Sequence, residues 1–475
     1  MGARSGIQMR RALLASIALA LAGCVVGPDY VAPETETPDL WRMQLTRGLA
    51  EGQAELQTWW KTLDDPTLTS LIERATEGSL DIRLALGRID EAASRRGIFR
   101  GEWFPSMSSV TGYQRARISD NVIQLPGTLP LGTNNFYDVG LGGSWEIDLF
   151  GRIRRSVEAA TAELDASVED YRDTLVILYA QVGLTYVDIR TLQERIRFNE
   201  QNIANQRGTL TLVRERNRAG LVGDLDVRQA EQNLGRTEAL LPFLRQSYVQ
   251  AVNRLGVLLG LVPSSLHAEL AVEGAVPVPP PEVLVGLPRE LLRQRPDVRA
   301  SERLLAAQTA RIGVATADLY PRLTILGSFA FQATDVANWT SWGSRAFSIG
   351  PKVIWNIFDG GRIRSNIRVQ DALTDQAVTQ YQQSVLEALE DAESSMIAFV
   401  EEQNRRDALQ RSATAASQAV ELVTTLYRTG LTNFQNVLDT ERSLFERQDE
   451  LAQSRGQVTQ NLITVYRALG GGWSP

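Results

Sequence analysis

The sequence predicts an α+β membrane protein in which two internal repeats each supply two membrane-crossing strands and one long helical hairpin. Three observations favour this fold class. The sequence repeats itself, short stretches alternate polar with apolar residues, and long proline-free stretches carry apolar residues at heptad spacing.

The internal repeat is visible as a segment that occurs twice. Residues Trp145 to Arg154 return 210 positions later as Trp355 to Arg364, with six of ten residues identical. Upstream the offset is 216, because Pro105 corresponds to Pro321, so the first copy carries six extra residues between Pro105 and Trp145. Two copies of about 200 residues are too few and too long for a solenoid array, which favours one structure with internal pseudo-symmetry.

Four strands are predicted from alternation and from the repeat. Apolar residues occupy most odd positions from 137 to 149, and the pattern returns from 347 to 357. Residues 323 to 331 give a third strand, whereas the fourth, near 106 to 115, rests on the repeat because its alternation is weak. Each stretch is about ten residues long, which suits a membrane-crossing β-strand.

Aromatic residues gather at the ends of these strands, where a girdle at the membrane interface would lie. They are Trp103, Phe104, Trp145, Tyr320 and Trp355. The alternative is an ordinary β-sandwich with a buried apolar face.

Long helices follow each pair of strands. Residues 152 to 217 contain no proline and carry apolar residues at heptad a and d spacing, and residues 362 to 428 form a second, looser seam. A continuous helix of this length reaches about 100 Å. Short turns at 218 to 224 and 428 to 433 lead into returning helices, so each repeat ends in a helical hairpin with an exposed tip. Pro242 predicts a local kink in the first returning helix.

Four strands cannot close a barrel, because open strand edges in lipid leave backbone groups unsatisfied. A dimer would give eight strands with almost no lumen, whereas a trimer gives twelve strands and room for a channel. We therefore expect a trimeric twelve-stranded transmembrane β-barrel, with four strands from each chain, continued by a long periplasmic barrel of α-helical coiled coils.

The start of the chain predicts export to the cell envelope. Arg10 and Arg11 precede an apolar run from 12 to 22 that is too short to span a bilayer but suits a signal peptide. The run ends in Leu-Ala-Gly-Cys24, which resembles the bacterial lipobox and predicts lipidation of Cys24. The alternative is a plain thiol beside an ordinary cleavage site, and the paired arginines leave a Tat signal open.

Composition argues against several other functions. Loss of residues 1 to 23 removes three arginines and no acid, so the mature charge is 46 − 56 = −10, which argues against nucleic acid as a partner. His267 has no second imidazole with which to bind a metal, and the only lysines, Lys61 and Lys352, follow no phosphate-binding loop. We expect no enzyme activity, no metal and no cofactor besides the covalent lipid on Cys24.

These features divide the chain into segments. We predict a signal peptide 1–23, a lipid anchor and N-terminal periplasmic segment 24–65, a first repeat 66–260, a linker 261–286, a second repeat 287–469 and a C-terminal tail 470–475. Each repeat begins with a helix. The predicted strands lie at about 104–116, 136–149, 321–332 and 346–358, the long helices at 152–217 and 362–428, and the returning helices at 225–259 and 434–469.

Several motifs between Cys24 and about Leu469 resemble those of a known family. They are Cys24-Val-Val-Gly-Pro-Asp-Tyr30, Trp59-Trp60 followed by Asp65-Pro66, Leu287 to Arg299, Tyr320-Pro321, and Tyr427-Arg-Thr-Gly-Leu431 with Val437-Leu438-Asp439. The chain resembles the TolC-like outer-membrane factors of tripartite efflux pumps, in particular their NodT/OprM-type lipoprotein branch. The resemblance implies a homotrimer in the outer membrane that acts as a passive exit duct for small molecules such as drugs, joined by a periplasmic adaptor to an RND-type inner-membrane pump.

The resemblance also assigns positions to function. It places the adaptor-docking tips at Arg218, Gly220, Leu221, Arg428, Gly430 and Leu431. Asp439 corresponds to the acid that narrows the periplasmic end of such ducts, with Asn436 at the companion position and with Asp224 and Asp226 as charges from the other repeat. A ring of three carboxylates would favour cations. The alternative for these acids, above all for Asp224, is capping of a helix N-terminus.

Two other functions stay open at this point. A duct of this kind could export polypeptides by type I secretion, and a non-conducting lipoprotein could act as a coiled-coil spacer in the envelope. The alternating strands argue against the spacer, and lipidation favours efflux by analogy.

Overall fold

The computed structural model describes residues 25–34, 37–52, 56–119 and 132–474. The chain forms two compact units. Of the described residues, the first unit contains 25–34, 88–119, 132–167 and 301–381, and the second contains 37–52, 56–87, 168–300 and 382–474. Four helices have residues in both: α3 (Leu80–Gly101), α4 (Arg152–Arg218), α8 (Pro296–Ala317) and α9 (Arg362–Arg428).

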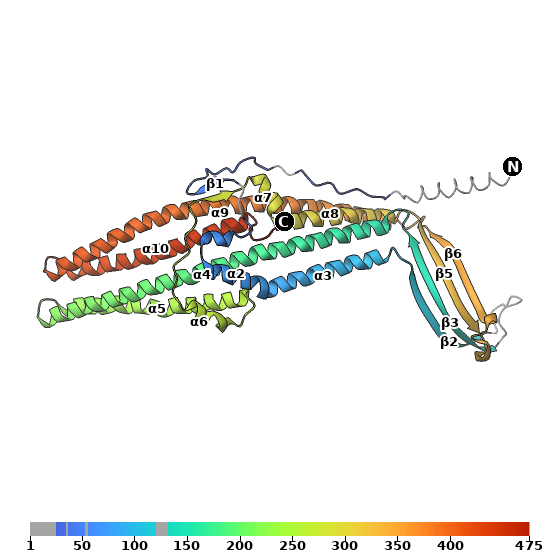
Figure 1. Ribbon diagram of the computed structural model, residues 1–475, viewed down its shortest axis with the longest axis horizontal. Coiled ribbons are helices and arrows are strands. Elements are labelled where there is room, and N and C mark those ends of the chain that lie inside the picture. Colours follow the sequence, from blue (N-terminus) through green and yellow to red (C-terminus); the bar gives the residue numbers. More distant parts are fainter. Residues whose placement is uncertain (1–24, 35–36, 53–55, 120–131, 475) are drawn as a thin grey trace. The chain divides into compact units, whose positions relative to one another are not determined.

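The first unit contains an antiparallel sheet of four strands in the order β2-β3-β5-β6 (Figure 1). The strands are β2 (Ser106–Ile118), β3 (Gly132–Ile147), β5 (Arg322–Ala333) and β6 (Arg345–Ile354). All four predicted strands are present, with ends shifted by up to four residues. Short 3-10 helices, η3 (Val336–Asn338) and η4 (Trp342–Ser344), lie between β5 and β6. The stretch between Pro105 and Trp145, which holds the six extra residues of the first copy, includes residues 120–131, which lie outside the described residues.

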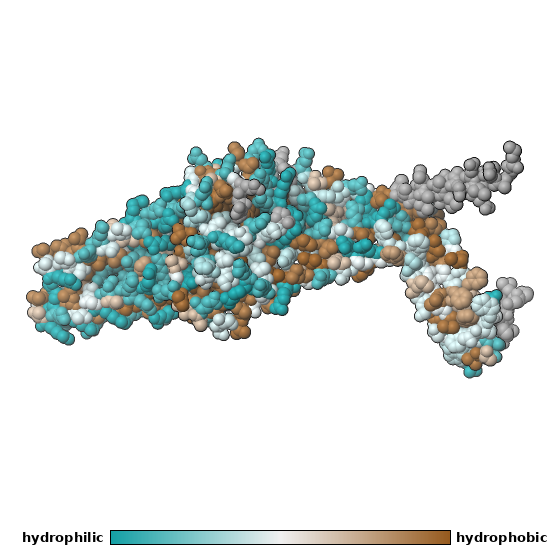
Figure 2. Space-filling model, in the orientation of Figure 1, coloured by the Kyte–Doolittle hydropathy of each residue, from teal (hydrophilic) through white to brown (hydrophobic). Residues whose placement is uncertain are grey.

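The two faces of the sheet differ in polarity, as alternation predicts. One face presents Leu141, Ile325 and Phe329 along a groove of about 430 Å³, whereas the other carries residues such as Thr324 and Lys352. Hydrophobic surface is visible over the sheet in Figure 2. The sandwich alternative is wrong, because the apolar face is not covered: Phe347 is 75% exposed and Ile349 is 80% exposed. Exposure of this size in neighbouring apolar side chains marks a membrane or partner surface.

The predicted girdle aromatics lie at the helix end of the sheet, and all are exposed. The indole of Trp145 donates to the backbone oxygen of Trp103 at 2.9 Å, and the indole of Trp355 repeats this bond with the oxygen of Leu319 at 3.0 Å. Tyr320 stacks on Phe150 with ring centroids 4.6 Å apart. The repeat therefore preserves a bond that ties each strand pair to the preceding helix.

The segment Val25–Tyr30, which we call the strap, is bound to α4 and α8. The Val26 amide donates to the oxygen of Phe150 at 3.2 Å, and the nearly buried guanidinium of Arg155 donates to Asp29 at 2.7 Å. Gly27 has a φ of 90°, and a Cβ there would lie 2.4 Å from the Cα of Gly313, so this crossing requires glycine. The predicted lipidation site, Cys24, lies outside the described residues.

The second unit is built on two helical hairpins. Helix α4 turns into α5 (Asp224–Leu258), and α9 turns into α10 (Phe434–Ala468), each within a residue or two of the prediction (Figure 1). Helix α5 is one continuous helix with Pro242 inside it. By length and composition, part of α4 could cross a membrane, but 72% of that apolar window is buried inside the chain and serves the predicted coiled-coil seam.

Shorter elements surround the middle of the hairpins. They are β1 (Leu49–Glu51) paired in parallel with β4 (Val283–Val285), and η1 (Trp59–Leu63), α2 (Pro66–Gly78), η2 (Pro263–Leu266), α6 (His267–Leu270) and α7 (Pro288–Gln294). The main core lies here. Trp59 is fully buried and stacks on Tyr466 with centroids 5.4 Å apart, while Trp60 packs edge-on against Tyr179 at 5.0 Å.

The described part of the C-terminal tail, residues 470–474, packs into this unit. The Trp473 ring is 9% exposed and lies between the guanidinium groups of Arg172 at 4.6 Å and Arg299 at 5.2 Å. Both arginines donate to the same oxygen of Glu169, each at 2.7 Å. The tail therefore ties α4 to α8.

A cavity of about 310 Å³ in the second unit is lined by acids and arginines, among them Asp173, Arg295 and Asp297. Burial raises the pKa of Asp173 to about 6, with Asp297 adding to the rise and Arg295 opposing it. Because the pKa is raised on folding, the contribution of Asp173 to stability is fully present below its ordinary pKa and is lost as the pH rises to about 6.

We expect Asp173→Asn to flatten the pH dependence of stability between about pH 4 and 6, where the native protein otherwise loses up to roughly 3 kcal/mol. The measurement is the midpoint of thermal unfolding of the purified protein at several pH values. Asp165→Asn, an exposed acid on the same helix, is the control. Identical pH profiles for Asp173→Asn and the unchanged protein would contradict the assignment.

Candidate functional site

The two hairpin tips have the same backbone geometry. Gly220 has a φ of 72° and Gly430 a φ of 81°, a left-handed conformation that ends each long helix. The Leu221 amide donates to the oxygen of Arg216 at 2.9 Å, and the Leu431 amide donates to the oxygen of Leu426 at the same distance. The leucine side chains that follow are 66% and 76% exposed. Each tip thus presents an apolar side chain to solvent on a tight turn.

Polar groups close each turn. The Asn217 side chain donates to the oxygen of Val222 at 3.0 Å and to the carboxylate of Asp224 at 3.1 Å. Gly223, and not Asp224, holds the N-cap position of α5. Asp224 lies in the first turn of the helix, where its negative charge interacts favourably with the helix dipole. In the second tip the N-cap is Asn433, which accepts from the Asn436 amide at 3.1 Å.

The proposed gate residues lie on the first turns of the returning helices. Asp439 is about half exposed, accepts from Gln435 at 2.9 Å and lies 3.8 Å from Arg442. Asn436 donates instead to the hydroxyl of Thr432 at 2.8 Å. The acid at 439 therefore keeps much of its surface open to solvent.

Asp226 of the first hairpin acts on a tyrosine of the second through its charge. Burial raises the pKa of Tyr427 in the second hairpin, Arg216 opposes this rise, and Asp226 of the first hairpin adds to it. The structure thus brings Asp226 near the second hairpin.

Arg216, which the sequence pattern does not single out, links the two hairpins near their tips. Its guanidinium donates to the backbone oxygen of Tyr427 at 2.6 Å and lies 4.7 Å from the centre of the Tyr427 ring. Beneath it a small apolar cluster joins both hairpins, formed by Leu210, Val213, Ala230, Tyr427, Phe434, Val437 and Leu438. Arg216 corresponds in the other repeat to Leu426, so comparison of the repeats does not identify it. It forms a clamp between the ends of α4 and α9.

Farther from the tips the hairpins are joined by polar contacts. The Thr209 hydroxyl donates to Glu441 at 2.6 Å, and Arg195 pairs with Asp449 at 2.7 Å. Burial raises the pKa of Glu441, whose counterpart in the first repeat, Glu231, is paired with two arginines. A groove of about 700 Å³ lies beside Glu441. Polar contacts can be exchanged for water at lower cost than an apolar core, so this interface suits hairpins that separate.

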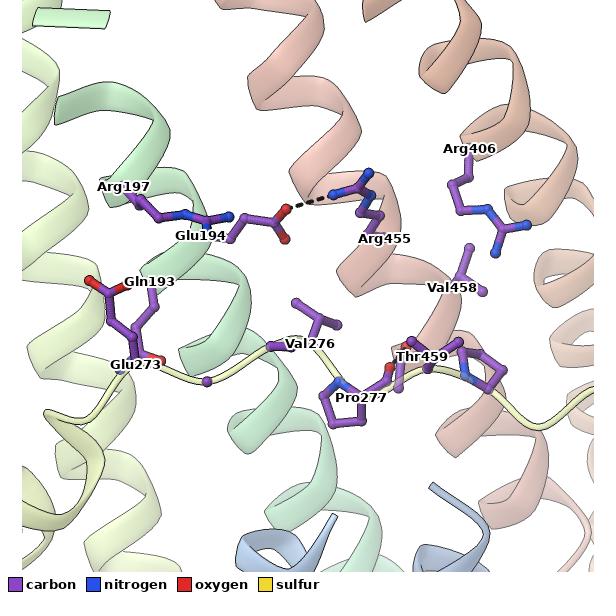
Figure 3. A pocket seen from close by; sticks show the side chains of 14 residues that line it. Gln193, Glu194, Arg197, Glu273, Val276, Pro277, Arg406, Arg455, Val458 and Thr459 are labelled. Carbon is purple, nitrogen blue, oxygen red and sulfur yellow. Dashed lines mark hydrogen bonds and ion pairs between the residues drawn. The ribbon is translucent and has the colours of Figure 1, made fainter. Parts of the chain in front are cut away.

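The linker between the repeats crosses a second groove, of about 610 Å³ (Figure 3). Glu194 of α4 and Arg455 of α10 pair across it at 2.8 Å, and the Thr459 hydroxyl donates to the oxygen of Pro277 in the linker at 2.7 Å. The linker and this ion pair hold the middle of the two hairpins together.

Comparison with known proteins identifies the family. Residues 71–261 and 287–471 match the model of the outer membrane efflux protein family, so the two matches follow the two repeats. Nodulation protein T of Rhizobium leguminosarum bv. trifolii is 30% identical over 469 residues, which cover 96% of each chain. Outer membrane protein OprJ of Pseudomonas aeruginosa is 29% identical over 463 residues, covering 96% of this chain and 95% of its own.

A solved structure has the same fold. The outer-membrane channel OprN is similar at a TM-score of 0.88 and 35% identity, over 95% of this chain and 100% of that chain. The predicted fold class, that of the trimeric TolC-like outer-membrane channels, is confirmed. The chain therefore belongs to the outer membrane efflux protein family and is the outer-membrane channel of an efflux system, with a large periplasmic portion.

Proposed function

We propose that this channel is a passive exit duct for small molecules, without catalysis, metal or cofactor, anchored by a lipid on Cys24. A periplasmic adaptor docks on its hairpin tips, and an RND-type pump in the inner membrane drives the cargo. Two relatives support this cargo class by name, the solvent efflux pump outer membrane protein SrpC and the pyoverdine export outer membrane protein OpmQ, both of Pseudomonas putida.

The matched geometry of the two tips carries the proposal. Gly220 and Gly430 have the same backbone conformation, and each is followed by an exposed leucine. Exposed apolar side chains on two equivalent turns suit a partner that binds both in the same way. Arg218 and Arg428 end the two long helices and add a positive charge beside each leucine.

Accumulation of a fluorescent dye in cells tests the docking. Cells that lack the chain should accumulate more dye than cells that carry it, and the double variant Gly220→Asp, Gly430→Asp should fail to restore efflux. Gly220→Asn, Gly430→Asn is the matched control, because asparagine tolerates a left-handed conformation without adding charge. If the Asp double variant restored efflux as fully as the Asn double variant, docking at the tips would be refuted. If dye levels did not differ between cells with and without the chain, while export of a polypeptide required the chain, protein secretion would be favoured.

The proposed gate gives a separate prediction. Three symmetry-related copies of Asp439 at the periplasmic end would favour cations and narrow the opening. Asp439→Ala should raise the conductance of the isolated channel in planar bilayers and lower its preference for potassium over chloride by roughly threefold or more. Glu446→Ala, an exposed acid two turns farther along α10, is the control. Unchanged conductance and selectivity in Asp439→Ala would remove Asp439 from the gate.

A further inference from the structure

The sheet has one lipid-facing surface that can be followed from end to end. Because β2 pairs Tyr113 with Tyr137, and β5 pairs Phe329 with Phe347, the odd-numbered residues of all four strands share one face. This is the face with the exposed apolar groove, lined by Leu141, Ile325, Phe329 and Ile349 among others. In an outer-membrane channel such a face contacts lipid.

A second aromatic row lies at the other end of this face, away from the helices. The rings of Tyr113 and Tyr137 have centroids 5.0 Å apart, and Trp339 of the β5–β6 loop lies 5.7 Å from Tyr137. Tyr137 and Trp145 are eight residues apart, which is about 26 Å along the strand and, at the usual strand tilt, about 20 Å across the membrane. This separation is close to the apolar band of about 25 Å that lies between the two aromatic girdles of outer-membrane barrels. The row at Tyr113 therefore marks the outer interface of the membrane.

Three arginines lie on or just beyond this outer row. Arg115 and Arg117 continue the lipid-facing series of β2 past Tyr113, and Arg345 begins β6 on the same face. All three side chains are exposed. Arg345 lies 4.5 Å from the centre of the Trp342 ring, a cation–π pair, and its Nη1 donates to the backbone oxygen of Trp342 at 2.7 Å. Their positions match the depth of lipid headgroups rather than of acyl chains.

The internal repeat shows that the fold does not require these charges. With the offset of 216, the counterparts of Arg115 and Arg117 on β5 are Phe331 and Ala333, which occupy the same face of the same sheet. Apolar residues therefore satisfy the strand geometry. The positive charge at these two positions is therefore specific to the first copy.

Closure of the barrel gathers the charges. The repeat relates β3 to β6 and β5 to β2, so the pairing of β3 with β5 predicts how β6 pairs with β2 of the next chain in the barrel. The observed pair of Tyr137 with Ala333 then corresponds to Phe347 facing Arg117 of the partner subunit. Arg345 lies two residues from Phe347 on the same face. A diagonal neighbour across strands is about 7–8 Å away. Arg345 of one chain and Arg117 of the partner subunit would then bind one anion together.

We propose that Arg115, Arg117 and Arg345 form a binding site, at the boundary between subunits, for the phosphate groups of lipid headgroups in the outer leaflet. The guanidinium groups bind phosphate through paired N–H donors. Tyr113 and Tyr137 pack against the glycerol or sugar region, and the acyl chains lie along the apolar groove. Each channel has three such sites, one at each subunit boundary.

Lipid retention tests the site. Purified trimer in detergent is incubated with lipid A that carries two phosphates, or with the same lipid after enzymatic removal of its phosphates, and bound lipid is counted by native mass spectrometry. Each Arg→Gln change should weaken retention of the phosphorylated lipid about fivefold, and Arg115→Gln with Arg117→Gln about 25-fold. Arg115→Lys with Arg117→Lys should retain most of the binding, which separates charge from folding.

Lys352→Gln is the matched control, because it removes one positive charge from the opposite face of the same sheet. Its retention of lipid should equal that of the unchanged channel. Equal retention by the double Gln variant, or equal binding of the dephosphorylated lipid, would overturn the proposal. Inorganic phosphate at millimolar concentration should displace little lipid, and full displacement would show a site for free phosphate instead.

Discussion

Replacing Arg216 with alanine should raise the open probability of the isolated channel by roughly tenfold or more. Arg216 donates a charged hydrogen bond to the Tyr427 oxygen and lies on its ring, so it holds the ends of two long helices together. A charged bond of this kind contributes about 1.5–3 kcal/mol. Its loss leaves the small apolar cluster to hold the tips together, while the polar contacts of Thr209 with Glu441 and of Arg195 with Asp449 lie farther along the hairpins.

Single-channel recording in planar bilayers measures this effect directly, and sensitivity of cells to a large antibiotic reports it in the membrane. Arg228→Ala is the control, because Arg228 is an exposed arginine near the same tip that pairs with Glu231 of its own helix. Arg216→Lys should lie between the unchanged channel and Arg216→Ala, since lysine keeps the charge but not the planar contact with the ring. An Arg216→Ala channel as closed as the unchanged one would show that the clamp does not control opening.

Replacing Trp473 with alanine should cost about 3–5 kcal/mol of stability and lower the midpoint of thermal unfolding by several degrees. The ring fills a nearly closed space between Arg172 and Arg299. Without it both guanidinium groups and Glu169 border a cavity, and the C-terminal segment loses its largest buried contact.

The midpoint is read from the loss of helical circular dichroism of the purified protein in detergent. Trp473→Phe should recover part of the loss because a smaller ring still packs between the arginines. Ser474→Ala changes the neighbouring exposed residue and should have no effect. Equal midpoints for Trp473→Ala and the unchanged protein would mean that the tail is not an anchor.

The strands and long helices could be predicted because their periodicity is strong and occurs twice. The ends of α4, α5, α9 and α10 were placed within a residue or two, since glycine in a left-handed turn marks each tip. The weak alternation of β2 was outweighed by its repeat partner, β5, which carries Phe329 and Phe331. The second copy thus predicted a strand whose own residue pattern in the first copy is too weak to predict it.

Contacts between the repeats could not be predicted in the same way. Arg216 and Tyr427 correspond to Leu426 and Asn217, so their bond has no copy to reveal it. Trp473 follows three glycines at the end of the chain, a composition typical of a loose tail, and only its packing between distant arginines shows its role. The aromatic girdle at the helix end was identified from its repeated tryptophans, whereas the outer row depends on strand pairing.

The strap has a consequence for the order of events during export. Tyr30 bonds to Glu302, 272 residues later in the chain, and Gly27 packs on Gly313. If export keeps pace with synthesis at about 5–20 residues per second, the strap emerges on the order of tens of seconds before its binding site exists. The segment beside the proposed lipid attachment point therefore stays accessible to modifying enzymes throughout that time, and closes only when the second repeat has arrived and folded.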